Sequence, residues 1–411
     1  MSVSCEAVFS AIIVIVAGLL FIDLVPLQET MRCPGNYTNS TECPEVFFSS
    51  TYQQARDRFL AAAEAAHGAI EHHLIARESS TEYYMDTVFF AGKQPGKLLV
   101  HCSGTHGVEG YTGSAIQVKL LQEWNETALS GPSILFVHAV NPFGMAHFRR
   151  FNEENVDLNR NYLTEEEWKL MQARDPNIAG YEDLRALLVP DASPRFIDRY
   201  VFFFTAAKAL ARHGFAKLKR AFVTGQYHDP QGIYYGGDRE QKSVAVLRSI
   251  LKTYAEAAKA TETIFIDVHT GLGPTGVDTF MVSDAHAEEK AKRVFTEARV
   301  QNDKTASRGP SSGYDLAAGI IRPVDVLGED ALVVTEEFGT VNSFFVARAT
   351  VLENAAYRLC RGSYVHVAMQ TWMRDAFYPQ EIKYKQSTLR RGCAAFWHAF
   401  QHLSTAVGPN G

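Results

Sequence analysis

The sequence predicts a three-layer α/β/α fold with a mixed, mostly parallel central sheet. Continuous apolar runs rich in β-branched residues are typical of strands that are covered on both faces. Helical stretches lie between these runs, and strands that alternate with helices are typical of α/β folds. The strand-like runs are 97–102, 133–140, 263–269 and 331–335, and the main helical stretches are 113–126, 196–213, 241–260, 285–300 and 343–360.

The chain begins with an apolar segment, Ala7 to Ile22, that contains no charged residue and is bounded by Glu6 and Asp23. An apolar run this close to the start usually targets a chain to the secretory pathway. We therefore expect residues 1–26 to be a hydrophobic signal peptide or an uncleaved signal anchor, with a buried core helix as the alternative. The run is not followed by a small-residue cleavage site, which favours the anchor.

The next segment, residues 27–48, is short and can be glycosylated. Asn36 and Asn39 begin two acceptor triplets, and a third begins at Asn125. Cys33 and Cys43 flank the first two triplets, which predicts a disulfide in an oxidising compartment. The sequence thus indicates a glycoprotein of the secretory pathway that is either anchored to a membrane or secreted.

The remaining residues, 49–405, are expected to form one catalytic domain. Hydrophobic residues make up 46% of the 411 residues and charged residues 21%, as in ordinary globular proteins. The net charge of −6, without a basic stripe, excludes the electrostatic surface that nucleic-acid binding needs. The domain begins with an alanine-rich pattern of helical spacing, which predicts a helix from Ser50 to about Ala76.

Polar motifs follow the predicted strands at the points where these strands should end. In open α/β sheets, sites form in the crevice outside the carboxyl ends of the strands, so we expect the motifs to meet there. They are THGVEG at 105–110, VDLNRN at 156–161, DVHTG at 267–271 and TEEFG at 335–339.

The first and third motifs supply candidate metal ligands. His106 and Glu109 are three residues apart in a loop that leads into a helix, so both side chains can turn toward one point. His269 ends a predicted buried strand, and Asp267 lies on the same strand face, where its carboxylate can hold the imidazole. Two histidines and one carboxylate leave a coordination position open, as in catalytic zinc sites. We expect one zinc ion per chain.

The fourth motif supplies a candidate general base. Glu336 and Glu337 are neighbours on a predicted strand, so they point to opposite faces and only one of them can face a metal. A carboxylate there can take a proton from zinc-activated water. An arginine in the second motif can bind an anionic group through paired N–H donors.

As an ordered set, these motifs resemble the zinc carboxypeptidases of the carboxypeptidase A type, over residues 95–340. The resemblance implies a zinc carboxypeptidase-like fold and places the catalytic glutamate at Glu337 rather than Glu336. It also implies a role for each of the other matching residues: His106, Glu109 and His269 as metal ligands, Arg150 as the oxyanion-stabilising arginine, Asn159 and Arg160 as the pair that binds the substrate's terminal carboxylate, and Tyr314 as a mobile substrate-binding tyrosine.

Two further resemblances lie within that superfamily. The run NPFGMAHFRR at 141–150 is similar to a separate branch found in bacteria and eukaryotes. The branch of aspartoacylase and succinylglutamate desuccinylase shows similar THGxE, DLNR and DxH elements. However, Val108 stands here where that branch usually has asparagine.

These observations predict a zinc-dependent hydrolase. We expect a metallocarboxypeptidase that cleaves a C-terminal peptide bond with zinc-activated water and Glu337 as general base. The alternative within enzymes is a zinc amidohydrolase that removes the acyl group from N-acyl amino acids. In both cases the substrate carries a free carboxylate. The alternative from another class is a non-catalytic descendant that binds a peptide.

Overall fold

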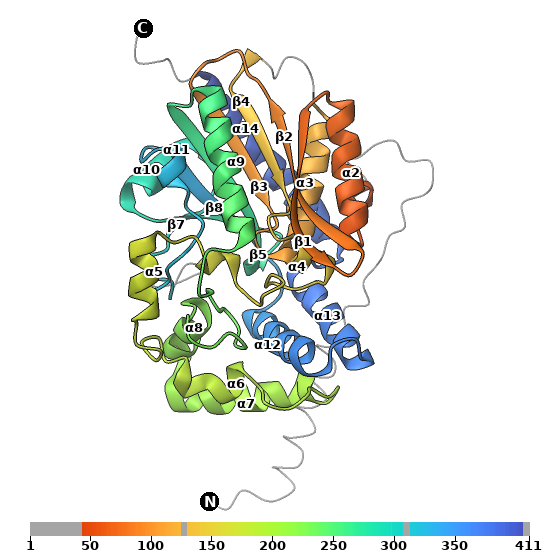
Figure 1. The fold of residues 1–411 in the computed structure, drawn as a ribbon, viewed down its shortest axis with the longest axis vertical. Coiled ribbons are helices and arrows are strands. Elements are labelled where there is room, and N and C mark those ends of the chain that lie inside the picture. The colour runs from red at the N-terminus through yellow and green to blue at the C-terminus, as the bar shows by residue number, and fades with distance from the viewer. Residues whose placement is uncertain (1–42, 125–129, 297, 307–312, 406–411) are drawn as a thin grey trace, which may run out of the picture.

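The computed structural model describes residues 43–124, 130–296, 298–306 and 313–405 (Figure 1). Its centre is an eight-stranded sheet with the strand order β1-β2-β4-β3-β5-β8-β6-β7. The strands are β1 (Ala69–Glu78), β2 (Thr81–Phe90), β3 (Lys97–Ser103), β4 (Ser133–His138), β5 (Glu262–Thr275), β6 (Asp278–Val282), β7 (Val300–Asn302) and β8 (Leu332–Gly339).

The middle of the sheet is parallel and its margins are mixed. Strands β4, β3, β5 and β8 run parallel to one another, as do β6 and β7. Antiparallel pairs join β1 to β2, β2 to β4 and β6 to β8. The predicted mixed, mostly parallel sheet is therefore confirmed.

Helices cover both faces of the sheet and extend beyond one end of it (Figure 1). Helices α2, α3 and α14 pack on one face, and α9 packs with α11 on the other. The α-helices are α2 (Tyr52–Ala65), α3 (Gly110–Gln122), α4 (Pro142–Ala146), α5 (Glu165–Gln172), α6 (Arg185–Leu188), α7 (Asp198–His213), α8 (Phe215–Val223), α9 (Lys242–Ala258), α10 (Ala285–Val294), α11 (Val324–Leu327), α12 (Ser343–Cys360), α13 (Tyr364–Phe377) and α14 (Ile382–Thr405).

The apolar runs of the sequence form the main core. Strand β4 is buried along its whole length, and so is β3 apart from its first residue. Helical apolar residues such as Phe59 and Phe396 complete the same cluster. A second cluster, which includes Leu188, Phe202 and Phe222, lies among α6, α7 and α8. These helices, with α12 and α13, lie beyond the sheet in Figure 1, at the bottom of the view.

The predicted helix from Ser50 to Ala76 is wrong in its second half. Helix α2 ends at Ala65, and β1 begins at Ala69. His67 has a φ of 56°, the left-handed conformation that commonly ends a helix. The residues after it form an edge strand paired with β2, and its largely exposed side chains lack the apolar alternation that would have indicated a strand.

The predicted N-terminal segment at residues 7–22, the three glycosylation triplets and Cys33 lie outside the described residues. Cys43 is described and is disulfide-bonded, whereas Cys102, Cys360 and Cys393 are free. The pairing of Cys43 with Cys33 stays a prediction. Within the described ranges, each helix is too short or too polar to cross a membrane.

Candidate functional site

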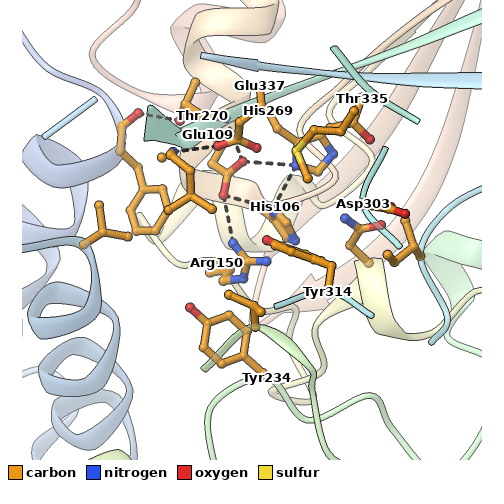
Figure 2. Close-up of a pocket in the computed structure, with 18 of the residues that line it drawn as sticks. His106, Glu109, Arg150, Tyr234, His269, Thr270, Asp303, Tyr314, Thr335 and Glu337 are labelled. Atoms are coloured by element: carbon orange, nitrogen blue, oxygen red, sulfur yellow. Dashed lines mark hydrogen bonds and ion pairs between the residues drawn. The ribbon is translucent and has the colours of Figure 1, made fainter. Parts of the chain in front are cut away.

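The site lies at the carboxyl end of β3 and near that of β8, beside His269 of β5. The predicted end of this strand at His269 is wrong, because β5 continues to Thr275. A tight turn at Gly104, with a φ of 73°, leads from β3 to His106 and the short helix η2 (Gly107–Glu109). His269 and Glu337 are paired neighbours on β5 and β8, so the register of these two strands brings the third and fourth motifs side by side. Figure 2 shows the side chains converging on one cavity.

Each histidine is held by a carboxylate at one ring nitrogen and presents the other to the cavity. His106 Nε2 lies 3.1 Å from Asp157 Oδ1, and His269 Nε2 lies 2.8 Å from Asp267 Oδ2. Thr105 Oγ1 donates to the Asp267 carboxylate at 2.9 Å. The predicted support of His269 by Asp267 is thus confirmed. A carboxylate partner at Nε2 fixes the proton there and leaves the Nδ1 lone pair to bind a cation.

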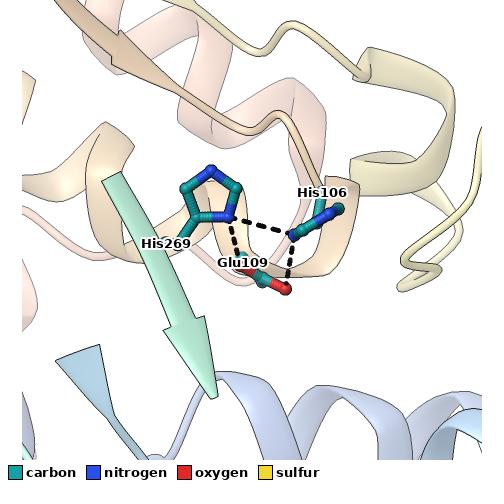
Figure 3. A group of neighbouring side chains, drawn as sticks. All are labelled: His106, Glu109 and His269. Atoms are coloured by element: carbon teal, nitrogen blue, oxygen red, sulfur yellow. Dashed lines mark hydrogen bonds and ion pairs between the residues drawn. The ribbon is translucent and has the colours of Figure 1, made fainter. Parts of the chain in front are cut away.

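The free sides of the two rings meet Glu109. Glu109 Oε1 lies 2.9 Å from His106 Nδ1, and Glu109 Oε2 lies 3.2 Å from His269 Nδ1 (Figure 3). The two Nδ1 atoms are 3.1 Å apart, and all three side chains are buried. Two nitrogen lone pairs and a carboxylate at such distances repel one another unless a positive charge lies among them. This donor set fits a zinc ion with one position left for water or substrate.

The electrostatics of the group also favour a positive charge at this point. Burial alone would lower the pKa of His269, but the Asp267 and Glu109 carboxylates outweigh it and raise this pKa well above its ordinary value. Burial raises the pKa of Glu109, yet His106, His269 and Arg150 bring it below the ordinary value. A metal cation can replace the proton that these carboxylates attract.

Glu337 faces the same cavity, and Glu336 points away from it. Glu337 Oε1 accepts a hydrogen bond of 2.8 Å from the Leu272 backbone N–H. Burial, and then the negative charge of Glu109, raise the pKa of Glu337 to about 7. Glu336 is buried near Asp278 and Arg391, where burial raises its pKa well above the ordinary value. A carboxyl group with a pKa near neutral, beside a metal site, is suited to proton transfer.

Arg150 lines the cavity beside Glu109. Its Nε donates to Asp157 Oδ2 at 2.9 Å, and one terminal nitrogen donates to Glu109 Oε1 at 3.1 Å. The guanidinium carbon lies 4.9 Å from the centre of the Tyr234 ring. A buried cation held in this way is available to stabilise negative charge that develops in the cavity.

Of the other predicted substrate-binding residues, two line the cavity and the third lies outside its lining. Asn159 and Tyr314 line the cavity. Arg160 is fully buried behind Tyr314, with its guanidinium carbon 5.4 Å from the centre of that ring. Its terminal nitrogens donate to the backbone carbonyls of Asn159 and Val223. The structure thus places Arg160 next to the cavity wall, against main-chain oxygens, and its role with a substrate carboxylate stays a prediction.

The structure adds residues that the sequence analysis had not assigned. Asp157 joins His106 to Arg150, and it lies in the VDLNRN motif, which could have pointed to it. Asp303 and Arg322 form an ion pair with each other in the cavity lining. They come from segments without a recognisable motif, so only the fold brings them to the site.

The fold resembles solved structures of other proteins at low sequence identity. The chain is similar to bovine thrombin-activatable fibrinolysis inhibitor in complex with tick carboxypeptidase inhibitor, with 12% identity over 88% of this chain and 98% of that chain and a TM-score of 0.48. A succinylglutamate desuccinylase/aspartoacylase from Rhodobacter sphaeroides is 13% identical over 71% of this chain and 64% of that chain, with a TM-score of 0.31. At these values the chemistry of the site rests on its own residues.

The sequence itself matches one protein family. No curated protein matches the chain. One family matches residues 48–391, which include the strands, the helices beyond the sheet and every residue of the cavity. The chain therefore belongs to the family described as "Protein of unknown function (DUF2817)".

Proposed function

We propose that this protein is a zinc-dependent hydrolase that cleaves an amide bond next to a free carboxylate. The observation that carries the proposal is the convergence of two histidine Nδ1 atoms and a carboxylate in one cavity that also contains Glu337. A metal site of this composition, with a carboxyl group beside it, is typical of hydrolysis by activated water.

Different residues of the chain have separate roles in hydrolysis. When bound by His106, Glu109 and His269, zinc supplies Lewis acidity, which polarises a carbonyl and acidifies water. Glu337 takes a proton from the attacking water and passes it to the leaving amine. Arg150 donates to the oxygen that becomes negative as the carbonyl is attacked. The side chains of Glu337 and Arg150 both line the cavity, so neither has to move into the site from elsewhere.

The substrate half that leaves as an amine is an amino acid with a free carboxylate, as in a metallocarboxypeptidase. Asn159 and Tyr314 line the side of the cavity that would receive it, and Arg160 lies directly behind them. The positive charge of Arg160 favours an anionic group there. Its paired N–H donors match two carboxylate oxygens if the Tyr314 ring moves aside.

A second candidate is an amidohydrolase that acts on N-acyl amino acids with the same groups. It is favoured by the apolar side chains of Val223, Leu272 and Val346 in the cavity lining, which suit an acyl group without further peptide bonds. The two candidates share the amide, the carboxylate and the mechanism. They differ in what lies on the acyl side of the bond.

Metal analysis combined with a substrate panel tests the proposal. We expect one zinc ion per purified chain and turnover that is lost on chelation and regained with zinc. Substrates with a free carboxylate should be cleaved faster than their amidated counterparts, whether they are peptides or N-acyl amino acids. Protein that lacks zinc after careful preparation would contradict the hydrolase and support a peptide-binding descendant instead.

We also propose that the catalytic domain functions in the secretory pathway. The disulfide at Cys43 supports this, because disulfides persist in oxidising compartments. The protein made in a eukaryotic host should change its mobility after glycosidase treatment. An unchanged mobility would count against the proposed glycosylation.

A further inference from the structure

A large groove continues from the catalytic cavity into the helices beyond the sheet. It has a volume of 680 Å³, within the range of roughly 300–1,000 Å³ that is typical of ligand sites. Its walls come from α7, α8 and α12. Four residues line both the groove and the catalytic cavity: Val223, Tyr234, Leu272 and Val346. The groove is therefore an extension of the site, and a substrate that reacts in the cavity can reach into it.

The lining of this groove is mostly apolar. Phe202, Leu218 and Phe222 are buried along it, and Phe344 lies on the α12 side. Polar side chains are few: Arg299 and Ser343 are exposed at the rim, and Lys219 on α8 is half-buried, where burial lowers its pKa to about 8. The groove thus offers apolar surface with few hydrogen-bonding groups inside.

This chemistry distinguishes between the two kinds of acyl group that the proposed hydrolase could accept. A peptide carries a backbone N–H and C=O at each residue, and each group left without a partner in an apolar site costs free energy. A hydrocarbon chain carries no such groups and gains from leaving water in proportion to the area that is buried. The groove therefore fits a hydrocarbon chain better than a peptide.

We propose that the groove binds the long hydrocarbon chain of an N-acyl amino acid whose amide bond lies in the catalytic cavity. This inference rests on the proposed zinc hydrolase and specifies its substrate class. In the reaction, the oxygen of water forms a bond to the acyl carbon and the carbon–nitrogen bond breaks. The nitrogen takes up a proton, so the products are a long-chain carboxylate and a free amino acid.

A series of substrates that differ only in acyl length tests the inference. N-acetyl, N-octanoyl and N-dodecanoyl derivatives of one amino acid should show kcat/KM rising with chain length. Each buried methylene contributes about a fourfold factor at most, so we expect a gain on the order of 100-fold or more from acetyl to octanoyl. Equal kcat/KM for the three substrates would overturn the inference.

Substitutions that fill the groove provide the structural half of the test. Ala347 lies on α12 in the groove lining, and Ala347→Trp should lower the ratio of dodecanoyl to acetyl kcat/KM at least tenfold. Ser343→Trp narrows the exposed rim and should lower the same ratio, which secures the test if Ala347→Trp does not fold. Ala207→Trp on the exposed outer face of α7 is the matched control and should leave the ratio unchanged.

An apolar peptide with the same terminal amino acid gives the competing outcome. If it is cleaved as fast as the dodecanoyl substrate, and Ala347→Trp impairs both equally, the groove binds peptides and the inference is wrong.

Binding of a compound that cannot be hydrolysed separates this inference from the proposed activity. N-dodecylglycine is a secondary amine without an amide bond to cleave, and its affinity can be measured by calorimetry on the wild type and on Ala347→Trp. Binding that Ala347→Trp weakens tenfold or more, without turnover of any acyl substrate, would support the groove and contradict the hydrolase. Zinc-dependent turnover of acyl substrates without such binding would support the hydrolase and contradict the binding of a hydrocarbon chain in the groove.

Discussion

The catalytic cavity and the apolar groove are neighbours, yet they are built from different parts of the fold. The cavity lies near the carboxyl ends of β3 and β8 and beside β5, and its charged groups contact one another at 2.8–3.2 Å. The groove lies between helices beyond the sheet, and its volume of 680 Å³ compares with 60 Å³ for the cavity. The sheet ends therefore determine the reaction, and the helices determine what can be attached to the reacting group.

The two regions should also respond differently to substitution. In the cavity, each buried charge compensates another, so removing one side chain leaves its partner buried and unpaired. In the groove, each side chain contributes apolar area, and the loss of one removes only a part of it. Large effects on all substrates are expected from the cavity, and graded effects that depend on the substrate are expected from the groove.

The largest effect is expected from Glu337→Gln. Glutamine keeps the oxygen that accepts from Leu272 N–H, but it cannot take a proton from water. Because general acid–base catalysis contributes about 10²–10⁴-fold, kcat should fall by at least two orders of magnitude for acetyl and dodecanoyl substrates alike. Zinc content should stay at one per chain. Activity within tenfold of the wild type would show that another group is the base.

The second-largest effect is expected from substitution of Arg150. Arg150→Met removes the donor to the developing oxyanion, which costs on the order of 10²–10³-fold in kcat. It also leaves Asp157 and Glu109 without their cation, and breaking a buried pair costs about 3–5 kcal/mol of stability. Arg150→Lys keeps the charge and should recover part of both losses. A Met variant with normal kcat but raised KM would show that Arg150 only binds substrate.

The sequence predicted the cavity far better than the groove, for a physical reason. A strand that ends at a site must place a few chemical groups at fixed spacing, so His106, His269 and Glu337 stand out as motifs. The alternation of a strand showed that only one of Glu336 and Glu337 can face the metal, and the family resemblance selected Glu337, which lines the cavity in the structure. Asp303 and Arg322, by contrast, meet only through the fold.

The groove had no signal of this kind. Phe202, Leu218 and Phe344 are apolar helical residues, and such residues in a sequence are equally compatible with core packing. Whether a neighbouring element covers the apolar face of a helix depends on the distance between the helices. The local sequence pattern does not encode this distance. The edge strand β1 was missed because the exposure of its side chains removes the apolar runs that identified the central strands.

A smaller effect is expected from Asp267, which holds the ring of His269 and is not itself a predicted metal ligand. Asp267→Asn removes the charge that holds His269 Nε2 but keeps an oxygen at the same place. Loss of such a partner typically costs 10–100-fold in metal affinity or activity, so zinc should dissociate at lower chelator concentrations. Asp284→Asn is the control: Asp284 caps α10, and asparagine caps a helix equally well. Unchanged zinc affinity in Asp267→Asn would mean that His269 is oriented by packing alone.

The smallest effect is expected at the rim of the groove, where the comparison can be made most sharply. Phe215 is 54% exposed and lines the groove, with its ring centre 6.4 Å from that of Phe344. Phe204 is 52% exposed on α7 and does not line the groove. Exposed substitutions usually change stability by about 0.5 kcal/mol or less, so both alanine variants should melt near the wild type.

Only Phe215→Ala should change selectivity. A bound chain would cover the exposed part of this ring, and half of a phenylalanine side chain contributes about 1 kcal/mol of apolar burial. The dodecanoyl to acetyl ratio of kcat/KM should therefore fall about fivefold in Phe215→Ala and stay unchanged in Phe204→Ala. Equal ratios in the two variants would mean that the chain does not reach the rim. The hydrocarbon would then end deeper in the groove, nearer the cavity, and the longest acyl chains should gain nothing over octanoyl.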